Sequence, residues 1–571
     1  MPRTSRSASN LISIPFLLIF LLTSCVSGQV GQKSSSEFRK GMVVSAHPQA
    51  SEVGIAILKK GGNAVDAAVA VQFALAVVYP NAGNIGGGGF LVYRSADGKT
   101  ATLDFREKAP AAASRNMYLD SAGNALADKS LYGHLAAGVP GSVDGMVKAH
   151  ARYGKLKWVD VVQPALDLAR KGFKLTEMQA GELNENQQVF RQYNPGKEYL
   201  VKEEEFHAGD LVKQEDLAKT FELIRDKGRA GFYEGEVADL IAAEMNAGGG
   251  LISKDDLRNY QAVWRDPIIG QYKGYKIITM PPPSSGGIAL MQLLNSVEPY
   301  PLKKWGHNSD STVQLIVEAE RRVYADRATH LGDPDFYNVP QKELLKPEYS
   351  LSRMKDFNWN RATLSSEING GEAAPAESAE TTHFSIVDQA GNAVSVTTTL
   401  NGSYGSKVFV QGAGFLLNNE MDDFSVKPGS PNMYGLVGGE ANAIIPGKRM
   451  LSSMTPTIIE KEGDLFMVVG TPGGSTIITS VFQTILNVIE FDKSMQGAVA
   501  AGRFHHQWLP DQVMYEKSSI DSLTLEKLKS KGYNLKPRPG TSGRVDAILK
   551  TPWGYYQGGA DPRGDDTAIG W

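Results

Sequence analysis

The sequence of 571 residues contains one cysteine, Cys25, and this scarcity excludes several kinds of site. A single cysteine cannot form an internal disulfide framework, and it cannot supply the clustered thiolates of zinc or iron–sulfur centres. An excess of one charge is also missing, because 59 Lys and Arg residues face 62 Asp and Glu residues. A nucleic-acid-binding protein typically carries a clustered basic excess, so we expect no nucleic acid among the partners.

Common catalytic motifs are absent too. The sequence has no HExxH motif, no Walker-type phosphate loop, no Gly-x-Ser-x-Gly elbow and no EF-hand loop. Its nine histidines do not cluster at the spacing of metal ligands. The adjacent His505 and His506 would point their ring nitrogens apart, which favours a structural role over a functional one. We therefore expect neither a metal nor a cofactor.

The composition that remains is that of a soluble globular protein. Hydrophobic residues make up 42% of the chain, which is enough for a large core. The 60 glycines and 28 prolines indicate many turns rather than low complexity. Beyond the N-terminus no uninterrupted apolar run reaches the roughly 18 residues of a membrane span, so we expect no transmembrane helix.

Residues 1–25 have the layout of a secretory signal peptide, with a basic start, an apolar stretch at 11–22 and small residues after it. The stretch 22–25, Leu-Thr-Ser-Cys, resembles the bacterial lipobox, in which the cysteine is lipidated and becomes the new N-terminus. The alternative is ordinary cleavage near Ser27, which would release a periplasmic or secreted protein. In both cases we expect the mature protein outside the cytoplasm, with contact to a membrane only through a lipid anchor.

Apolar patterning predicts a mixture of helices and strands. The stretch Asn63–Val78 is apolar nearly all round, which is typical of a helix packed on both sides. Two strand-like stretches, 90–93 and 101–105, follow a run of four glycines. A buried strand at 464–470 turns through a glycine-containing loop into an apolar helix at 477–489. The expected fold class is therefore α/β.

An acidic segment of small residues at 365–380 precedes two β-branched runs, 381–388 and 393–400, which predict a hairpin. The first strand of this hairpin begins at Thr381. A threonine hydroxyl is a poor nucleophile without a base, and cleavage of the bond between Glu380 and Thr381 would supply an α-amino group whose pKa suits that task. On this pattern alone the better interpretation is that a β-branched residue opens the strand because of its propensity.

Several short stretches alter that balance, because in their order along the chain they together resemble the γ-glutamyltranspeptidases, a family of N-terminal-nucleophile hydrolases. The resemblance runs from about residue 40 to the end of the chain. The stretches that carry it are 61–68 (GGNAVDAA), 104–110 (DFREKAP), 138–143 (GVPGSV), 381–388 (TTHFSIVD), 391–401 (GNAVSVTTTLN), 416–424 (LLNNEMDDF), 431–439 (PNMYGLVGG), 451–457 (LSSMTPT) and 470–475 (GTPGGS).

The resemblance implies a four-layer αββα sandwich and a precursor that cuts itself. Residues 1–25 would be the signal, 26–380 the large chain and 381–571 the small chain, and both chains would build one interwoven fold. Thr381 would accept the γ-glutamyl group of glutathione or another γ-glutamyl compound and pass it to water, an amino acid or a peptide. No metal or cofactor is implied.

The resemblance also assigns roles to individual residues. Arg106 would anchor the substrate α-carboxylate, since a guanidinium pairs with a carboxylate through two hydrogen bonds. Gly473 and Gly474 would present backbone N–H groups to the oxyanion at the start of a helix. The remaining assignments are Ser452 and Ser453 for the same carboxylate, Asn401, Glu420 and Asp423 for the ammonium group, Thr399 for orientation of the Thr381 hydroxyl, and Tyr434 for a lid loop over the pocket at 425–440.

Alternatives stay open at this point. Taken singly, Arg106 is better explained by packing, Asp423 by a solvated turn and the two glycines by a tight connection. His383 as the base of a Ser/His/Asp-type hydrolase is the least favoured assignment. A cephalosporin or glutaryl acylase of the same superfamily is a second enzyme hypothesis, against which the lid loop argues, and a non-catalytic extracytoplasmic binding protein is a third. Glu420 stands where some bacterial members have Gln, and the linker before Thr381 does not match the family closely.

Overall fold

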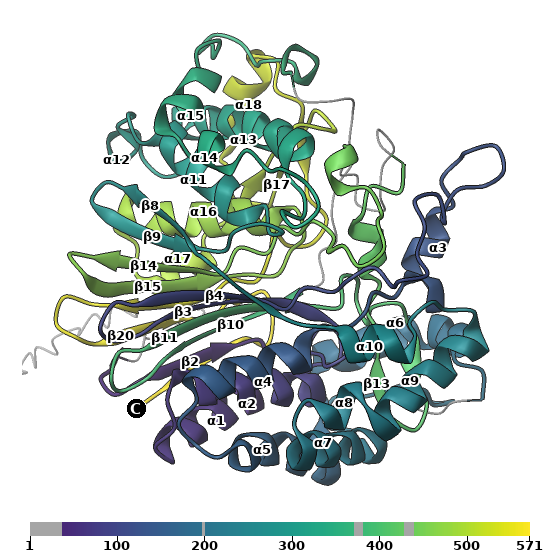
Figure 1. Ribbon diagram of the computed structural model, residues 1–571. Coiled ribbons are helices and arrows are strands. Elements are labelled where there is room, and N and C mark those ends of the chain that lie inside the picture. Colours follow the sequence, from purple (N-terminus) through teal and green to yellow (C-terminus); the bar gives the residue numbers. More distant parts are fainter. Residues whose placement is uncertain (1–36, 197–199, 370–380, 428–438) are drawn as a thin grey trace, which may run out of the picture. The chain divides into compact units, whose positions relative to one another are not determined.

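The computed structural model describes residues 37–196, 200–369, 381–427 and 439–571, which lie within the unit Ser35–Trp571 (Figure 1). Two seven-stranded antiparallel sheets lie at its centre. Sheet I has the strand order β21 (Thr567–Gly570), β2 (Met42–Ser45), β10 (Thr381–Val387), β11 (Ala393–Thr399), β3 (Gly88–Arg94), β4 (Thr100–Asp104) and β7 (Val263–Arg265).

Sheet II packs against one face of sheet I, with β10 and β11 in contact with strands β14, β15 and β19. Its strand order is β1 (Glu37–Phe38), β20 (Tyr556–Gly559), β19 (Asp546–Lys550), β15 (Asp464–Gly470), β14 (Thr457–Lys461), β9 (Tyr275–Thr279) and β8 (Ile268–Tyr272). Central strands of a sheet that is covered on both faces are buried along their length, and all residues of β10 and β11 are buried accordingly.

Helices cover the outer face of each sheet (Figure 1). Sheet I is covered by α1 (Pro48–Lys59), α2 (Ala64–Val78) and α4 (Ser142–Tyr153). Sheet II is covered by α11 (Gly286–Val297), α16 (Thr476–Ile489) and α17 (Met495–Ala500), and α13 (Asp310–His330) packs on α11. The order helix, sheet, sheet, helix is the predicted four-layer αββα sandwich.

The remaining elements surround these layers. Further helices are α3 (Ala127–Leu131), α5 (Trp158–Lys171), α6 (Glu177–Tyr193), α7 (Glu215–Lys227), α8 (Ala230–Tyr233), α9 (Gly235–Gly248), α10 (Lys254–Asn259), α12 (Leu302–Trp305), α14 (Gln341–Leu344), α15 (Pro347–Arg353) and α18 (Ser522–Ser530). Short 3-10 turns are η1 (His134–Ala136), η2 (Ser365–Glu367), η3 (Glu420–Asp423) and η4 (Glu440–Asn442). Small sheets pair β5 (Phe173–Lys174) with β6 (Leu211–Val212), β12 (Phe409–Val410) with β13 (Phe415–Leu416), and β17 (Val513–Tyr515) with β16 (Phe504–His505) and β18 (Leu535–Pro537).

Helix α2 shows why this arrangement follows from the sequence. Asn63 caps the helix by accepting hydrogen bonds from Val65 N and Asp66 N, and Asp66 bonds back to the Asn63 N–H. All residues of the helix are buried, which the uniform apolar character of the stretch predicts. The predicted strands at 90–93, 101–105 and 464–470 are β3, β4 and β15, and the predicted helix at 477–489 is α16.

Strands from both sides of Thr381 alternate in sheet I. Strands β10 and β11 lie between β2 and β3, which come from the first half of the chain, and β21 pairs with the outer side of β2. Neither half of the chain could form this sheet alone. Within the described ranges, no helix has both the length and the apolarity that crossing a membrane requires.

Candidate active site

Thr381 is the first residue of β10, and its partner in the antiparallel register is Thr399 at the end of β11. The Thr381 hydroxyl donates a hydrogen bond of 3.3 Å to Thr399 Oγ1, which also accepts one of 2.7 Å from Asn401 N. Since side chains alternate along a strand, Thr382 points to the other face of sheet I. The hairpin therefore brings a strand-opening hydroxyl and its predicted orienting group together.

A buried ionic cluster lies at the same pocket. Arg106 follows β4 and is 1% exposed, and its two terminal nitrogens bond Glu420 and Asp423 of η3. Its backbone is fixed as well, because Asp104 accepts from Arg106 N and Tyr260 OH donates to Arg106 O at 2.8 Å. This pairing of Arg106 with both carboxylates, which the sequence did not predict, joins segments about 300 residues apart in the chain.

Glu107 adds a carboxylate that the sequence did not single out. It is fully buried, and one of its oxygens lies 3.6 Å from Arg106 Nη1. Burial raises the pKa of Glu107 to about 7, against the lowering effect of Arg106. Burial raises the pKa of Glu420 as well, and Glu107 adds to that increase. Burial thus favours the neutral form of both carboxyls.

Ser452 and Ser453 are held by a loop that precedes α11. Ser285 N and Ser285 Oγ both donate to Ser452 O at 2.7 Å, and Ser452 N donates to Pro283 O. Ser452 Oγ in turn accepts from Met454 N at 3.2 Å. Because this loop comes from the first half of the chain, the two predicted serines are fixed by contacts that cross the predicted cleavage point.

Gly473 and Gly474 connect β15 to α16, as expected. Both have positive φ angles, +134° and +56°, which favour glycine. Their carbonyls accept hydrogen bonds from Thr476 N and Ile477 N in the first turn of α16. The loop therefore places the peptide groups of two glycines at the N-terminus of α16, where backbone N–H groups favour the binding of an anion.

One pocket gathers these predicted residues. Its lining includes the nucleophile candidate, the ionic cluster, both serines and one glycine of the loop; the residues are Arg106, Thr381, Thr399, Asn401, Glu420, Asp423, Ser452, Ser453, Met454, Gly474 and Ile477. Gly473 is the neighbour of Gly474 but is not among the lining residues. Glu380, Tyr434 and the signal segment 1–25 lie outside the described residues.

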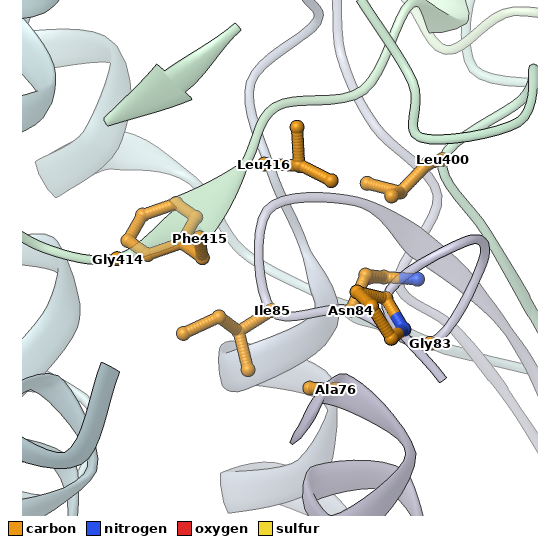
Figure 2. A pocket seen from close by; sticks show the side chains of 9 residues that line it. Ala76, Gly83, Asn84, Ile85, Leu400, Gly414, Phe415 and Leu416 are labelled. Carbon is orange, nitrogen blue, oxygen red and sulfur yellow. The ribbon is translucent and has the colours of Figure 1, made fainter. Parts of the chain in front are cut away.

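A different pocket, shown in Figure 2, shares no residue with this one. It is lined mainly by apolar groups, among them Ala76, Ile85, Leu400 and Phe415, and Asn84 contributes the polar side chain. Such a lining has no ionisable group and no hydroxyl. Of these two pockets, only the one at Thr381 brings ionisable side chains and hydroxyls together.

The histidines take structural positions. His383 bonds Thr397 Oγ1 and Ser385 Oγ between the two sheets, and burial lowers its pKa to about 3. His505 bonds Thr479 and Gln507. His506 bonds Asp511 and accepts from Trp508 N. The expected divergence of the adjacent pair is confirmed, and no group of His, Cys, Asp and Glu in the described ranges is arranged to hold a metal ion.

The sequence did not single out several contributors to the site, among them Glu107, Ser285, Arg327 and Asn442. Asn442 donates to Asp423 O at 2.7 Å and accepts from Leu451 N at 2.9 Å, so its amide joins the ionic cluster to the serine segment. The loop before α11 has the sequence PPPSSGG at 281–287, and nothing in these residues indicates which segment the loop holds.

Comparisons with a family model, with curated proteins and with solved structures point to the same family. Residues 50–571 match the family model described as gamma-glutamyltranspeptidase. The chain is 48% identical over 537 residues to the glutathione hydrolase proenzyme of Escherichia coli K12, covering 93% of this chain and 92% of that protein. A crystal structure of Helicobacter pylori gamma-glutamyltranspeptidase is 46% identical with a TM-score of 0.56, covering 57% of this chain and 94% of the other. Cephalosporin acylase from Bacillus halodurans has a TM-score of 0.83 at 25% identity, covering 95% and 97%.

Proposed function

The chain belongs to the γ-glutamyltranspeptidase family, and we propose that the Thr381 pocket is where it hydrolyses glutathione and transfers the γ-glutamyl group. The observation that carries this proposal is the lining of one pocket by a strand-opening threonine, a buried arginine and two carboxylates. A γ-glutamyl donor presents a carbonyl to be attacked, an α-carboxylate and an α-ammonium group. The pocket has a group of suitable character for each of them.

The enzyme is made as a precursor and becomes active by cleavage between Glu380 and Thr381. Thr381 attacks the carbonyl of Glu380, the acyl group moves from nitrogen to oxygen, and water hydrolyses the resulting ester. The products are a large chain that ends at Glu380 and a small chain, 381–571. The interleaving of β10, β11 and β21 with β2 and β3 supports continued association, because separation would break sheet I along several strand pairs.

The substrate's two charged groups bind to the ionic cluster and the serines. Arg106, with Ser452 and Ser453, binds the α-carboxylate, since a guanidinium and hydroxyls are all donors. Glu420, Asp423 and Asn401 bind the α-ammonium. Arg106 is bonded to both carboxylates in the structure, so these groups hold one another in place before a donor arrives.

The reaction proceeds by an acyl-enzyme. The free α-amino group of Thr381 takes the hydroxyl proton while Oγ1 attacks the γ-carbonyl, and Thr399 orients that hydroxyl through the 3.3 Å contact. Gly473 and Gly474 donate backbone N–H groups to the oxyanion. The amine leaves with the proton, cysteinylglycine in the case of glutathione. Water or the amine of an amino acid or peptide then attacks the ester and releases Thr381.

Each of these steps uses protein groups alone, so the proposal includes no metal or cofactor. We place the mature enzyme outside the cytoplasm, as a periplasmic, secreted or lipid-anchored protein. Tyr434, in the segment 425–440, is proposed to cover the bound γ-glutamyl group. The acylase hypothesis is disfavoured by the ammonium-binding carboxylates, because a glutaryl donor has no α-amino group for Glu420 and Asp423 to bind.

The test is N-terminal sequencing of the purified protein together with Thr381→Ala. The wild type should give two chains, one of which begins at Thr381, and should release amine from γ-glutamyl donors. Thr381→Ala should remain a single chain without turnover, whereas the control Thr382→Val, on the opposite strand face, should be cleaved normally. A fully cleaved Thr381→Ala variant would show that another residue is the nucleophile.

A further inference from the structure

Helix α13 lies behind the pocket and contacts two of its parts. Tyr324 donates through its hydroxyl to Ser475 O, next to Gly474. Arg327 donates to Ser453 Oγ at 3.0 Å and to Ser285 Oγ at 2.9 Å. Residues three apart on a helix share one face, so a single face of α13 supports both the oxyanion loop and the serine segment.

The contact between Arg327 and Ser453 fixes the direction of a hydrogen bond. A guanidinium has donors and no acceptor, so Ser453 Oγ must accept from Arg327. A hydroxyl has one hydrogen, which Ser453 can therefore give only to a group other than Arg327. Ser453 lines the pocket together with Arg106, so its hydroxyl hydrogen is suited to a negatively charged acceptor such as a carboxylate.

The contact between Arg327 and Ser285 fixes a second hydrogen bond in the same way, because the guanidinium can only donate. Ser285 Oγ accepts from Arg327 and passes its own hydrogen to Ser452 O at 2.7 Å. Arg327 thus sets the direction of both hydroxyls and fixes the backbone between the two serines. Its side chain is 4% exposed, so the positive charge is poorly screened by water and contributes to the potential at Ser453.

We infer that Arg327 is a positioning residue for recognition of the substrate α-carboxylate, acting through Ser453 and Ser285. The inference rests on the proposed function, because it gives the carboxylate-binding serines a second cation that does not itself line the pocket. Arg327 comes from the large chain and Ser453 from the small chain, so this part of the site is completed across the two chains.

The test compares Arg327→Gln with wild type as processed enzymes. We expect the KM for a γ-glutamyl anilide to rise about 10-fold with kcat within about twofold, as for loss of a charged hydrogen-bond donor. The inhibition constant of L-glutamate should rise by a similar factor. That of γ-aminobutyrate, which lacks the α-carboxylate, should stay within about twofold. Equal weakening of both inhibitors would mean a general structural role and would overturn the inference.

Two further variants keep the test decisive. Arg327→Lys keeps the charge and the donors but not the planar fork, so we expect a rise in KM of no more than about threefold, again specific to the α-carboxylate. A lysine variant as impaired as the glutamine variant would overturn the inference. Arg322→Gln is the matched control, since Arg322 is a buried arginine of α13 that bonds Glu318 and Asp356, and it should leave both inhibition constants unchanged.

Combination with Ser453→Ala separates this inference from the proposed function. If Arg327 acts through Ser453 and Ser285, Arg327→Gln should weaken the binding of L-glutamate less in the Ser453→Ala variant than in the wild type. If the inhibition constant of L-glutamate in the double variant equals the product of the two single effects, the inference is overturned. If Ser453→Ala itself leaves the inhibition constant of L-glutamate unchanged, the proposed carboxylate site fails. If Ser453→Ala weakens L-glutamate and Arg327→Gln does not, only the role of Arg327 fails.

Discussion

The Thr381 pocket has a charged part, built from Arg106, Glu420 and Asp423 with the adjoining Glu107, and a backbone part, built from Gly473 and Gly474. The charged part is assembled from side chains of distant segments and is almost fully buried. The backbone part is one short loop whose shape depends on two positive φ angles. The first can recognise a substrate before reaction, and the second suits a charge that forms only during reaction.

This difference predicts where mutations act. Charged groups that hold one another in a fixed arrangement contribute to ground-state binding, so their loss should appear in KM. Backbone donors aimed at an oxyanion contribute mainly in the transition state, so their displacement should appear in kcat. A mutation in the charged part that changes only kcat, or one in the backbone part that changes only KM, would contradict this assignment.

The largest effect is expected for Arg106→Ala in the charged part. It removes the cation and leaves Glu420 and Asp423 buried without their arginine, so we expect KM for γ-glutamyl donors to rise at least about 30-fold. Steady-state kinetics of the processed enzyme would measure this. Arg94→Ala is the matched control: Arg94 is a buried arginine paired with Glu460 at 2.5 Å, at the opposite end of β3 from the pocket. An unchanged KM in Arg106→Ala would show that another cation binds the carboxylate.

A smaller effect is expected for Gly473→Ala in the backbone part. A Cβ at this position would lie 2.6 Å from Thr476 Oγ1 and 3.0 Å from Gly543 Cα, so the loop must shift. Displaced N–H groups should lower kcat about 10- to 100-fold with little change in KM. Gly463→Ala is the control, because Gly463 also has a positive φ, +87°, but an added Cβ meets nothing within 4 Å. A rise in KM at constant kcat would contradict the assigned role.

The two parts also differ in how far the sequence could predict them. The glycine loop between a buried strand and an apolar helix was readable because all its determinants are local. The hairpin at Thr381 and the Asn63 cap of α2 were readable for the same reason. Arg106 and Glu420 were predicted only through resemblance to a family, since no local pattern indicates a contact across about 300 residues.

Residues that act through others were not predicted at all. Arg327 lies in the last turn of α13, where an arginine would ordinarily be assigned to a solvated helix end, yet its side chain is buried. Ser285 belongs to a loop whose partner segment is more than 160 residues away. Glu107 is adjacent to Arg106, but its pKa depends on burial and on Glu420, and neither can be read from the local sequence.

The smallest expected effect concerns pH, because only the charged part can titrate. Burial raises the pKa of Glu107 to about 7, above its value in the unfolded chain. Between these two values the folded state holds a proton that the unfolded state has lost, so the stability from this group is fully present at low pH and is lost as pH rises through 7. Glu107→Gln removes the titration but keeps the shape. The Tm of the wild type should therefore fall relative to that of Glu107→Gln between about pH 5 and pH 8, as measured by thermal unfolding.

The comparison with the variant removes the contribution of the buried histidines to the pH dependence of Tm, since both proteins contain them. That contribution has the opposite sign, because burial lowers the pKa values of these histidines. Parallel Tm curves would mean that Glu107 keeps an ordinary pKa, and the charged part would then hold its full set of negative charges at neutral pH.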